Sequence, residues 1–355
     1  MRLVICSTVC ALVAGALNWA TAAEIPAPSG PSVVDPAARL EWLFTRTVPV
    51  EGGLTEGPAV ARDGSIYFSD IPFGKDPGMI LRFDPRTKQT TVFSADSGKS
   101  NGLIFDAQGR LVACEGAAYG GRRISRWDVT TGQRTVLTDR FEGKRYNAPN
   151  DICLDRQGRI YFTDPRYVGD EPRELAHRAV YRIDTDGTVA EVTHDVVKPN
   201  GIAISPDERT LYVADHDNGT DRIDPSAPAP APAQGVMRIY AFELRPEKTV
   251  GNRRILVDFG DKKGCDGMTV DAEGNVYLTT RDPSRPGVLV VDPAGKEVAF
   301  LPTGPAGQSG AEATGLPSNV EFGVGDEANV LYITVDKSLC RIRLKKQGYH
   351  RQFMP

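Results

Sequence analysis

The sequence predicts an all-β protein, a single six-bladed β-propeller with four-stranded blades. Three observations predict this class. One hairpin-like pattern recurs six times, the copies follow one another at a spacing typical of propeller blades, and no convincing helical periodicity occurs beyond the first 23 residues. Radial repetition of small sheets leaves only short, protected strand edges, which makes such a ring a stable arrangement.

The first 23 residues have the order of a secretory signal. Arg2 precedes an apolar run of about fifteen residues, and small residues follow at Ala20, Ala22 and Ala23. The run is shorter than the ~20 apolar residues that a membrane-spanning helix needs, so a membrane anchor is the less favoured alternative. We expect cleavage after Ala22 or Ala23 and a periplasmic or secreted protein with no membrane association. Residues 24–39 are expected to form an N-terminal linker.

Each copy of the repeat has the pattern of a strand, a D-x-x-G-type turn and a second strand rich in β-branched or aromatic residues. Two further strands follow, as in GMILRFDP and QTTVFSA after the first copy. Successive copies begin 45, 49, 50, 66 and 53 residues apart, the period of four-stranded blades. The copies are EGPAVARDGSIYFSD from Glu56, NGLIFDAQGRLVACE from Asn101, NDICLDRQGRIYFTD from Asn150, NGIAISPDERTLYVAD from Asn200, DGMTVDAEGNVYLTT from Asp266 and the weaker NVEFGVGDEANVLYITV from Asn319.

The sixth copy lacks residues for a fourth strand. Only SLCRIRLKK separates VLYITV from a polar C-terminal tail at residues 347–355. The segment LEWLFTRTVPV at residues 40–50 belongs to no other blade. We expect it to supply the missing strand, so that pairing of the N-terminal and C-terminal strands closes the ring. The propeller would then occupy residues 40–346 as one domain.

The longest spacing, between the fourth and fifth copies, contains DHDNGTDRIDPSAPAPAPAQG. A Pro/Ala run cannot take part in a hydrogen-bonded strand ladder and favours an extended, exposed conformation. The sequence therefore predicts a loop insertion within blade four and not a domain boundary.

Composition gives no electrostatic argument for a nucleic-acid partner. The chain has 42 Lys and Arg against 46 Asp and Glu, a net charge of −4, with neither a basic stripe nor an acidic tail. Buried free thiols are expected, although an exported compartment permits one disulfide. Cys6 and Cys10 belong to the signal, and the remaining cysteines show no metal-type spacing: Cys114, Cys153, Cys265 and Cys340.

The residues that begin the six copies are polar where a strand would favour apolar side chains. Inner strands of a propeller line its channel, so these residues should converge at one face. Carboxylate and amide oxygens suit a hard divalent cation, Ca²⁺ first, with Mg²⁺, Mn²⁺ or Zn²⁺ as alternatives. Each residue alone is better explained as a turn former or a partner for backbone groups. Glu56, Asn200 and Asp266 together favour a metal site, because buried carboxylates need partners. The ring comprises Glu56, Asn101, Asn150, Asn200, Asp266 and Asn319.

The second strand of each copy returns to the same face, and the loops that follow are long, rich in Pro and Gly, and chemically varied, as binding loops often are. We expect these loops to form the wall of a pocket, with the strand ends Asp70, Glu115, Asp164, Asp215 and Thr280 near the ring. Ordinary loop surface is the alternative for each loop residue. The candidate substrate-binding residues are Asn101, Asn150, Tyr167 and His216, with Tyr119, His177 and Arg281 as further candidates.

The chain resembles the family of senescence marker protein, gluconolactonase and luciferin-regenerating-enzyme-like proteins. The resemblance covers five of the six blades, from about residue 50 to 335, and its motifs are specific in this order and spacing. They are TEGPAV at 55–60, NAPNDICLDRQGRIYFTDPRY at 147–167, KPNGIAISPDERTLYVAD at 198–215 and CDGMTVDAEGNVYLTT at 265–280.

This resemblance implies a six-bladed propeller with one catalytic divalent cation at the channel mouth. The resemblance implies that the metal ligands are Glu56, Asn200 and Asp266, each matched by its motif. It implies that Asn150 is either a fourth ligand or a neighbour that faces the substrate. Asp266 also matches the position of the general base. Ala148 stands where animal-type members place an Arg that contacts the sugar.

The implied activity is an exported, metal-dependent lactonase acting on a sugar-derived or other small lactone. The metal would polarise the lactone carbonyl or an attacking water, and Asp266 would accept the proton. No G-x-S-x-G motif or triad context is present, which favours direct hydrolysis over an acyl-enzyme. Two alternatives stay open, because fold does not fix function. One is a metal-dependent hydrolase or lyase/isomerase acting on another oxidised sugar or phosphoester, and the other is a non-catalytic ligand-binding propeller with a structural cation.

Overall fold

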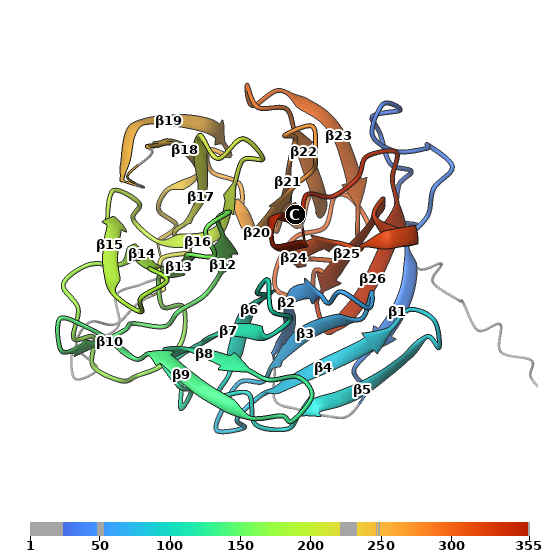
Figure 1. Cartoon of the computed structure of the whole chain (residues 1–355). Helices are drawn as coiled ribbons and strands as arrows, with labels where there is room; N and C mark the ends of the chain where they lie inside the picture. Colours follow the sequence, from blue (N-terminus) through green and yellow to red (C-terminus); the bar gives the residue numbers. More distant parts are fainter. Residues whose placement is uncertain (1–23, 48–52, 221–232, 246, 248, 354–355) are drawn as a thin grey trace, which may run out of the picture.

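Six four-stranded antiparallel sheets surround a central axis in the computed structural model (Figure 1). The structure describes residues 24–47, 53–220, 233–245, 247 and 249–353. The predicted class, an all-β six-bladed propeller, is confirmed. An additional two-stranded ribbon, β10 (Arg140–Phe141) and β11 (Lys144–Arg145), lies outside the blades.

Within each of the first five blades the strands follow one another in sequence order from the channel outward. The first blade contains β2 (Leu54–Val60), β3 (Ile66–Ile71), β4 (Met79–Asp84) and β5 (Gln89–Ser94). The second contains β6 (Ser100–Phe105), β7 (Leu111–Glu115), β8 (Arg123–Trp127) and β9 (Arg134–Thr138). The third contains β12 (Ile152–Leu154), β13 (Ile160–Asp164), β14 (Ala179–Ile183) and β15 (Val189–Thr193). The fourth contains β16 (Pro199–Ile204), β17 (Thr210–His216), β18 (Met237–Leu244) and β19 (Val250–Asp258). The fifth contains β20 (Cys265–Val270), β21 (Val276–Thr280), β22 (Gly287–Val291) and β23 (Glu297–Pro302).

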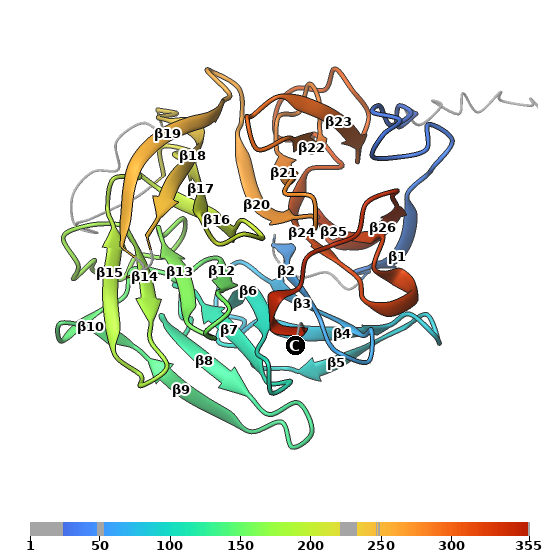
Figure 2. The same cartoon turned by 45° about the horizontal axis from the view of Figure 1, so that its top comes forward.

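The sixth blade joins the two ends of the chain. It contains β24 (Pro317–Phe322), β25 (Val330–Val335), β26 (Ser338–Arg343) and, as its outer strand, β1 (Glu41–Thr45), which pairs antiparallel with β26. Strand β1 lies beside β26 in both views (Figure 1, Figure 2). The predicted closure of the ring is therefore confirmed. Just beyond β1, the buried Arg46 forms an ion pair of 3.1 Å with Asp70 of β3, which links the closing strand to blade one.

The inner hairpins form because the D-x-x-G turns satisfy their own backbone groups. In blade three, an Asp155 carboxylate oxygen accepts the amide N–H groups of Gln157 and Arg159 at 2.9 and 3.1 Å. Gly158 takes a φ of +77°, in the left-handed region that favours glycine. The turn fixes the register in which Ile152 of β12 pairs with Phe162 of β13.

The apolar core is divided among the interfaces between neighbouring blades. Buried side chains of blades one and two pack together around Tyr67 and Leu103, and those of blades three and four around Tyr161 and Ile202. The cysteines beyond the predicted signal are buried in these layers as free thiols: Cys114, Cys153, Cys265 and Cys340.

The segments flanking the blades are packed against the propeller. Residues 24–39, assigned from the sequence to a linker, place Val33 and Val34 in the core between blades five and six, with exposed fractions of 1% and 0%. In the C-terminal tail, Gly348 bridges to Asp271. The predicted signal, residues 1–23, lies outside the described residues. Within the described ranges, no helix has the length and apolar character needed to span a membrane.

The insertion predicted in blade four follows β17 and precedes β18, so it lies within that blade as expected. Its Pro/Ala-rich part, at residues 221–232, lies outside the described residues.

The carboxyl group of Glu321, which lies close to His350 of the C-terminal tail, leads to a prediction about stability. The side chain of Glu321 is 16% exposed, and this partial burial raises its pKa from 4.5 to about 8, although the carboxylate accepts a hydrogen bond of 2.7 Å from the Phe322 N–H. The side chain of His350 lies 3.8 Å away, and burial lowers its pKa to about 4, so above that pH it supplies no charge to Glu321. The folded protein thus holds a proton that the unfolded chain releases at pH 4.5. Stability should therefore fall as pH rises from about 4.5 to about 8.

Glu321→Gln should remove this loss. We expect the variant to be more stable than the wild type at pH 8 by at least about 1 kcal/mol, with the difference shrinking towards pH 5. Thermal unfolding across this pH range measures it, with the exposed Glu312→Gln as control. Equal stability of the Glu321→Gln variant and the wild type at pH 8 would contradict a raised pKa of Glu321 in the folded protein.

Candidate functional site

One cavity, of about 470 Å³, brings together all seven residues predicted as catalytic, metal-binding or substrate-binding. These residues come from four blades and from loops that are distant in sequence. They are Glu56, Asn101, Asn150, Tyr167, Asn200, His216 and Asp266. Of the further candidates, Arg281 also lines the cavity. Tyr119 and His177 do not line it: Tyr119 is 69% exposed, and His177 stacks on His194.

The local backbone explains how the ring residues approach one another. In β2, β6, β16 and β20, the strand pairing is irregular where the polar residue is followed by glycine. A side chain at Gly57 would place its Cβ 2.2 Å from the carbonyl oxygen of Asn101, and one at Gly201 would place it 2.4 Å from that of Asp266. Glycine thus permits neighbouring inner strands to contact each other through their backbones, which holds the polar side chains around one point.

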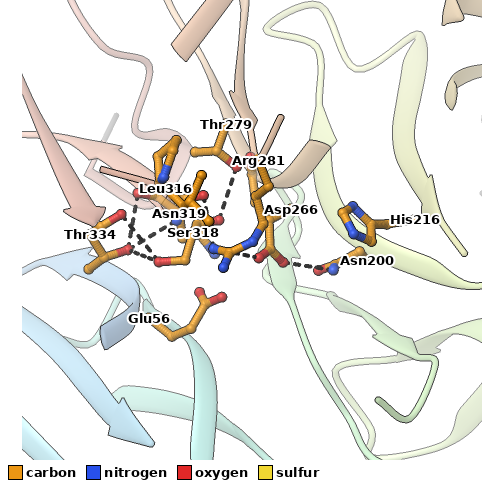
Figure 3. Close-up of polar contacts among 12 residues, drawn as sticks. Glu56, Asn200, His216, Asp266, Thr279, Arg281, Leu316, Ser318, Asn319 and Thr334 are labelled. Atoms are coloured by element: carbon orange, nitrogen blue, oxygen red, sulfur yellow. Dashed lines mark hydrogen bonds and ion pairs between the residues drawn. The ribbon is translucent and has the colours of Figure 1, made fainter. Parts of the chain in front are cut away.

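Asp266 stands at the centre of the polar contacts in the cavity (Figure 3). Its Oδ1 accepts a hydrogen bond from Asn200 Nδ2 at 2.7 Å, and its Oδ2 lies 3.4 Å from Arg281 Nη1. Arg281 also donates to the Pro317 carbonyl at 3.2 Å. The carboxylate is therefore oriented from both sides.

Among the acidic residues of the site, the negative charge of Glu56 is balanced least by neighbouring groups. Its exposed fraction is 3%, and its carboxylate accepts the neighbouring Gly57 N–H at 3.0 Å. Burial raises the pKa of Glu56 well above its usual range, and the nearby carboxylates of Asp266 and Asp151 raise it further. Glu56 forms no ion pair with a Lys or Arg of the described residues, and the nearby charge of Arg281 offsets the rise of its pKa only in part.

A divalent cation fits this donor set. Buried carboxylates that repel one another are costly without a positive partner, and the oxygens of Glu56, Asp266, Asn200 and Asn150 are the ligand types that hard cations prefer. In the described ranges, no group of three or more His, Cys, Asp or Glu residues has metal-site geometry, so any cation here would depend on the amides as well.

Sequence reasoning missed Asp151, which lies in the channel rather than among the cavity-lining residues. Its carboxylate accepts the Ile202 N–H at 3.2 Å and an Asn319 amide hydrogen at 3.3 Å. Burial raises the pKa of Asp151 to about 7. The signal in the sequence is that blade three carries Asp151 where blades one, two, four and five carry glycine. Asn319, predicted as a ring member, binds Asp151 and does not line the cavity.

Tyr167, in the loop after β13, and His216, at the end of β17, were predicted to contact substrate, and backbone groups hold both in position. The Nδ1 of His216 lies 2.9 Å from the Cys265 carbonyl oxygen, and burial lowers the pKa of His216, which favours the neutral imidazole. The hydroxyl of Tyr167 donates to the carbonyl oxygen of His216 at 3.1 Å. Both rings therefore form fixed parts of the cavity wall.

The acidic strand ends have a structural task. Asp164 accepts the N–H groups of Asn147 and Ala148 at 2.8 and 2.6 Å, and Asp215 accepts two N–H groups before β16 in the same way. These two carboxylates anchor the backbone that enters β12 and β16. The strand ends Asp70, Glu115, Asp164, Asp215 and Thr280 are not among the residues that line the cavity.

Comparison with known proteins identifies relatives of the whole propeller. The family model described as the SMP-30/Gluconolactonase/LRE-like region matches residues 54–226 and 235–337. A gluconolactonase of Zymomonas mobilis is 28% identical over 337 residues, covering 87% of this chain and 85% of the relative. The lactonohydrolase oryL of Aspergillus oryzae is 27% identical over 287 residues, which cover 73% of this chain and 64% of the relative. A solved gluconolactonase of Xanthomonas campestris superposes with a TM-score of 0.69 at 28% identity, over 90% of this chain and 95% of that one.

Proposed function

Because the chain belongs to the SMP-30/gluconolactonase/LRE-like family, we propose that it is a lactonase that depends on a divalent metal. The observation that carries the proposal is the meeting of Glu56, Asn200 and Asp266 in one cavity. The relatives named gluconolactonase and lactonohydrolase support lactone hydrolysis. The substrate class is a small lactone, whether sugar-derived or not.

Glu56, Asn150, Asn200 and Asp266 would hold the cation, with Ca²⁺ first and Mg²⁺, Mn²⁺ or Zn²⁺ as alternatives. When bound, the metal would supply a positive charge that stabilises the negative oxygen developing on the attacked carbonyl. The burial of Glu56 and its proximity to other carboxylates support this assignment.

The protein's own groups account for the proton movements. Water attacks the carbonyl carbon, and Asp266 accepts its proton as general base. The ring C–O bond then breaks, and the proton passes to the leaving oxygen, which yields an open-chain hydroxy acid. Asn200 and Arg281 hold the Asp266 carboxylate for this task through the 2.7 and 3.4 Å contacts.

Acid release from purified protein on a panel of aldonolactones and simple γ- and δ-lactones tests the proposal. We expect turnover on at least one class, and loss of it when the metal is removed. Failure with every lactone, with each of the four metals supplied, would reject the lactonase. A phosphoesterase, a lyase/isomerase or a non-catalytic binding protein would then become the leading account.

We further propose that the protein is exported to the periplasm or the medium. The signal-like order of residues 1–23 supports this. Mass spectrometry of protein expressed with its own N-terminus should find a mature chain that begins at Ala23 or Glu24. An intact N-terminus in the cytoplasmic fraction would contradict export.

A further inference from the structure

The cavity has two chemically different sides. Asp266, Asn200 and His216, from blades four and five, form the polar side. Blades one to three supply the polar Glu56, Asn101 and Asn150 and also an apolar part of the lining. This part, which we call the apolar side, includes Leu54, Ile71, Phe73, Ala117, Ala148 and Val168.

Large apolar side chains also reach solvent at the mouth of this cavity. Phe73 is 50% exposed and Val168 is 47% exposed, and both line the cavity. They come from different loops, after β3 and after β13. Exposed apolar surface that is continuous with a ligand cavity favours binding of apolar ligand groups.

Several polar groups near the apolar side already have partners. The Lys99 ammonium donates to the carbonyl oxygens of Pro72 and Gly74 at 3.4 and 2.5 Å. Asn218 Oδ1 accepts a hydrogen bond of 2.6 Å from Lys198 Nζ, and the Tyr167 hydroxyl donates to the His216 carbonyl. A polyhydroxylated substituent placed against Phe73 and Val168 would lose hydrogen bonds to water without replacing them, which is costly.

We propose that the lactone this site takes carries an alkyl or aryl substituent, which lies against the apolar side between Phe73 and Val168. This proposal rests on the proposed lactonase function and narrows its substrate class. The lactone carbonyl is directed at Asp266 and Glu56, and the substituent points towards Phe73 and Val168. Each methylene that the wall covers should raise kcat/KM by about two- to fourfold, until the substituent outgrows the wall.

The test is kcat/KM for δ-valerolactone, δ-octanolactone, δ-decanolactone and glucono-δ-lactone, measured with the same metal. The expected order rises with alkyl length and places glucono-δ-lactone lowest. Phe73→Ser and Val168→Ser should raise KM for the two longer lactones several-fold, and should raise KM for glucono-δ-lactone much less. Val136→Ser is the matched control, since Val136 is 49% exposed and belongs to β9, the outer strand of blade two.

A higher kcat/KM for glucono-δ-lactone than for every alkyl lactone would overturn this inference but would still support the proposed lactonase function. So would equal effects of the two pocket variants on all four substrates. Absence of hydrolysis with all four substrates and with the wider lactone panel would reject the proposed function and this inference together.

Discussion

Asp266→Asn is expected to lower kcat for lactone hydrolysis by about 10²- to 10⁴-fold, the usual contribution of a general base. The amide has the shape of the carboxylate but cannot accept a proton from water at neutral pH. Asp266 lies between Asn200 Nδ2 and Arg281 Nη1, so the substituted side chain can remain in the same place. Activity assays at saturating metal and substrate measure the effect.

The fold of this variant should be unchanged, because Asp266 contributes to the cavity and not to the cores between blades. Asp261→Asn, on an exposed loop before β20, is the matched control and should keep full activity. Thermal unfolding of both variants should resemble that of the wild type. Turnover within about tenfold of the wild type in Asp266→Asn would reject Asp266 as the base and would favour a binding role for the site.

Glu56→Gln is expected to weaken metal binding by at least about tenfold, equivalent to 1.4 kcal/mol. The substitution removes one of the negative charges that the cation would neutralise. It also relieves the repulsion between Glu56 and the carboxylates of Asp266 and Asp151. The metal-free variant should therefore be at least as stable as the metal-free wild type, although its affinity for the metal is lower.

Two measurements separate these effects. Calorimetric titration gives the dissociation constant of the metal, and thermal unfolding with and without metal gives the stabilisation on binding, which should shrink in the variant. Glu312→Gln, at an exposed loop position, is the control and should behave as the wild type. Unchanged affinity together with lower metal-free stability would mean that Glu56 has a structural role.

The fold could be predicted from the sequence because its determinants are local and repeated. The turn at Asp155 and Gly158 satisfies its own backbone groups, so the motif carries the geometry of the hairpin wherever it occurs. Counting strands was sufficient to assign β1 to blade six. The packing of Val33 and Val34 has no such local signal, because it depends on a surface that exists only after blades five and six have formed.

For the site, the repeat predicted residues that line one cavity, but it did not reveal their partners. The contact between Arg281 and Asp266 depends on the path of a loop, which periodicity does not describe. Asp151 was overlooked because the pattern places it beside Asn150, and only the channel geometry shows that it approaches Glu56. Asp164 and Asp215 were expected near the ring because they end strands, whereas the structure uses them to bind backbone N–H groups.

The most direct test of the account is lactone hydrolysis by the mature protein before and after chelation, with Ca²⁺, Mg²⁺, Mn²⁺ and Zn²⁺ added back singly. We predict that activity disappears with the chelator and returns with one or more of these metals, Ca²⁺ first, and that Glu56→Gln needs more metal for half-maximal recovery. Full activity in protein shown by elemental analysis to hold no metal would contradict a metal-dependent lactonase.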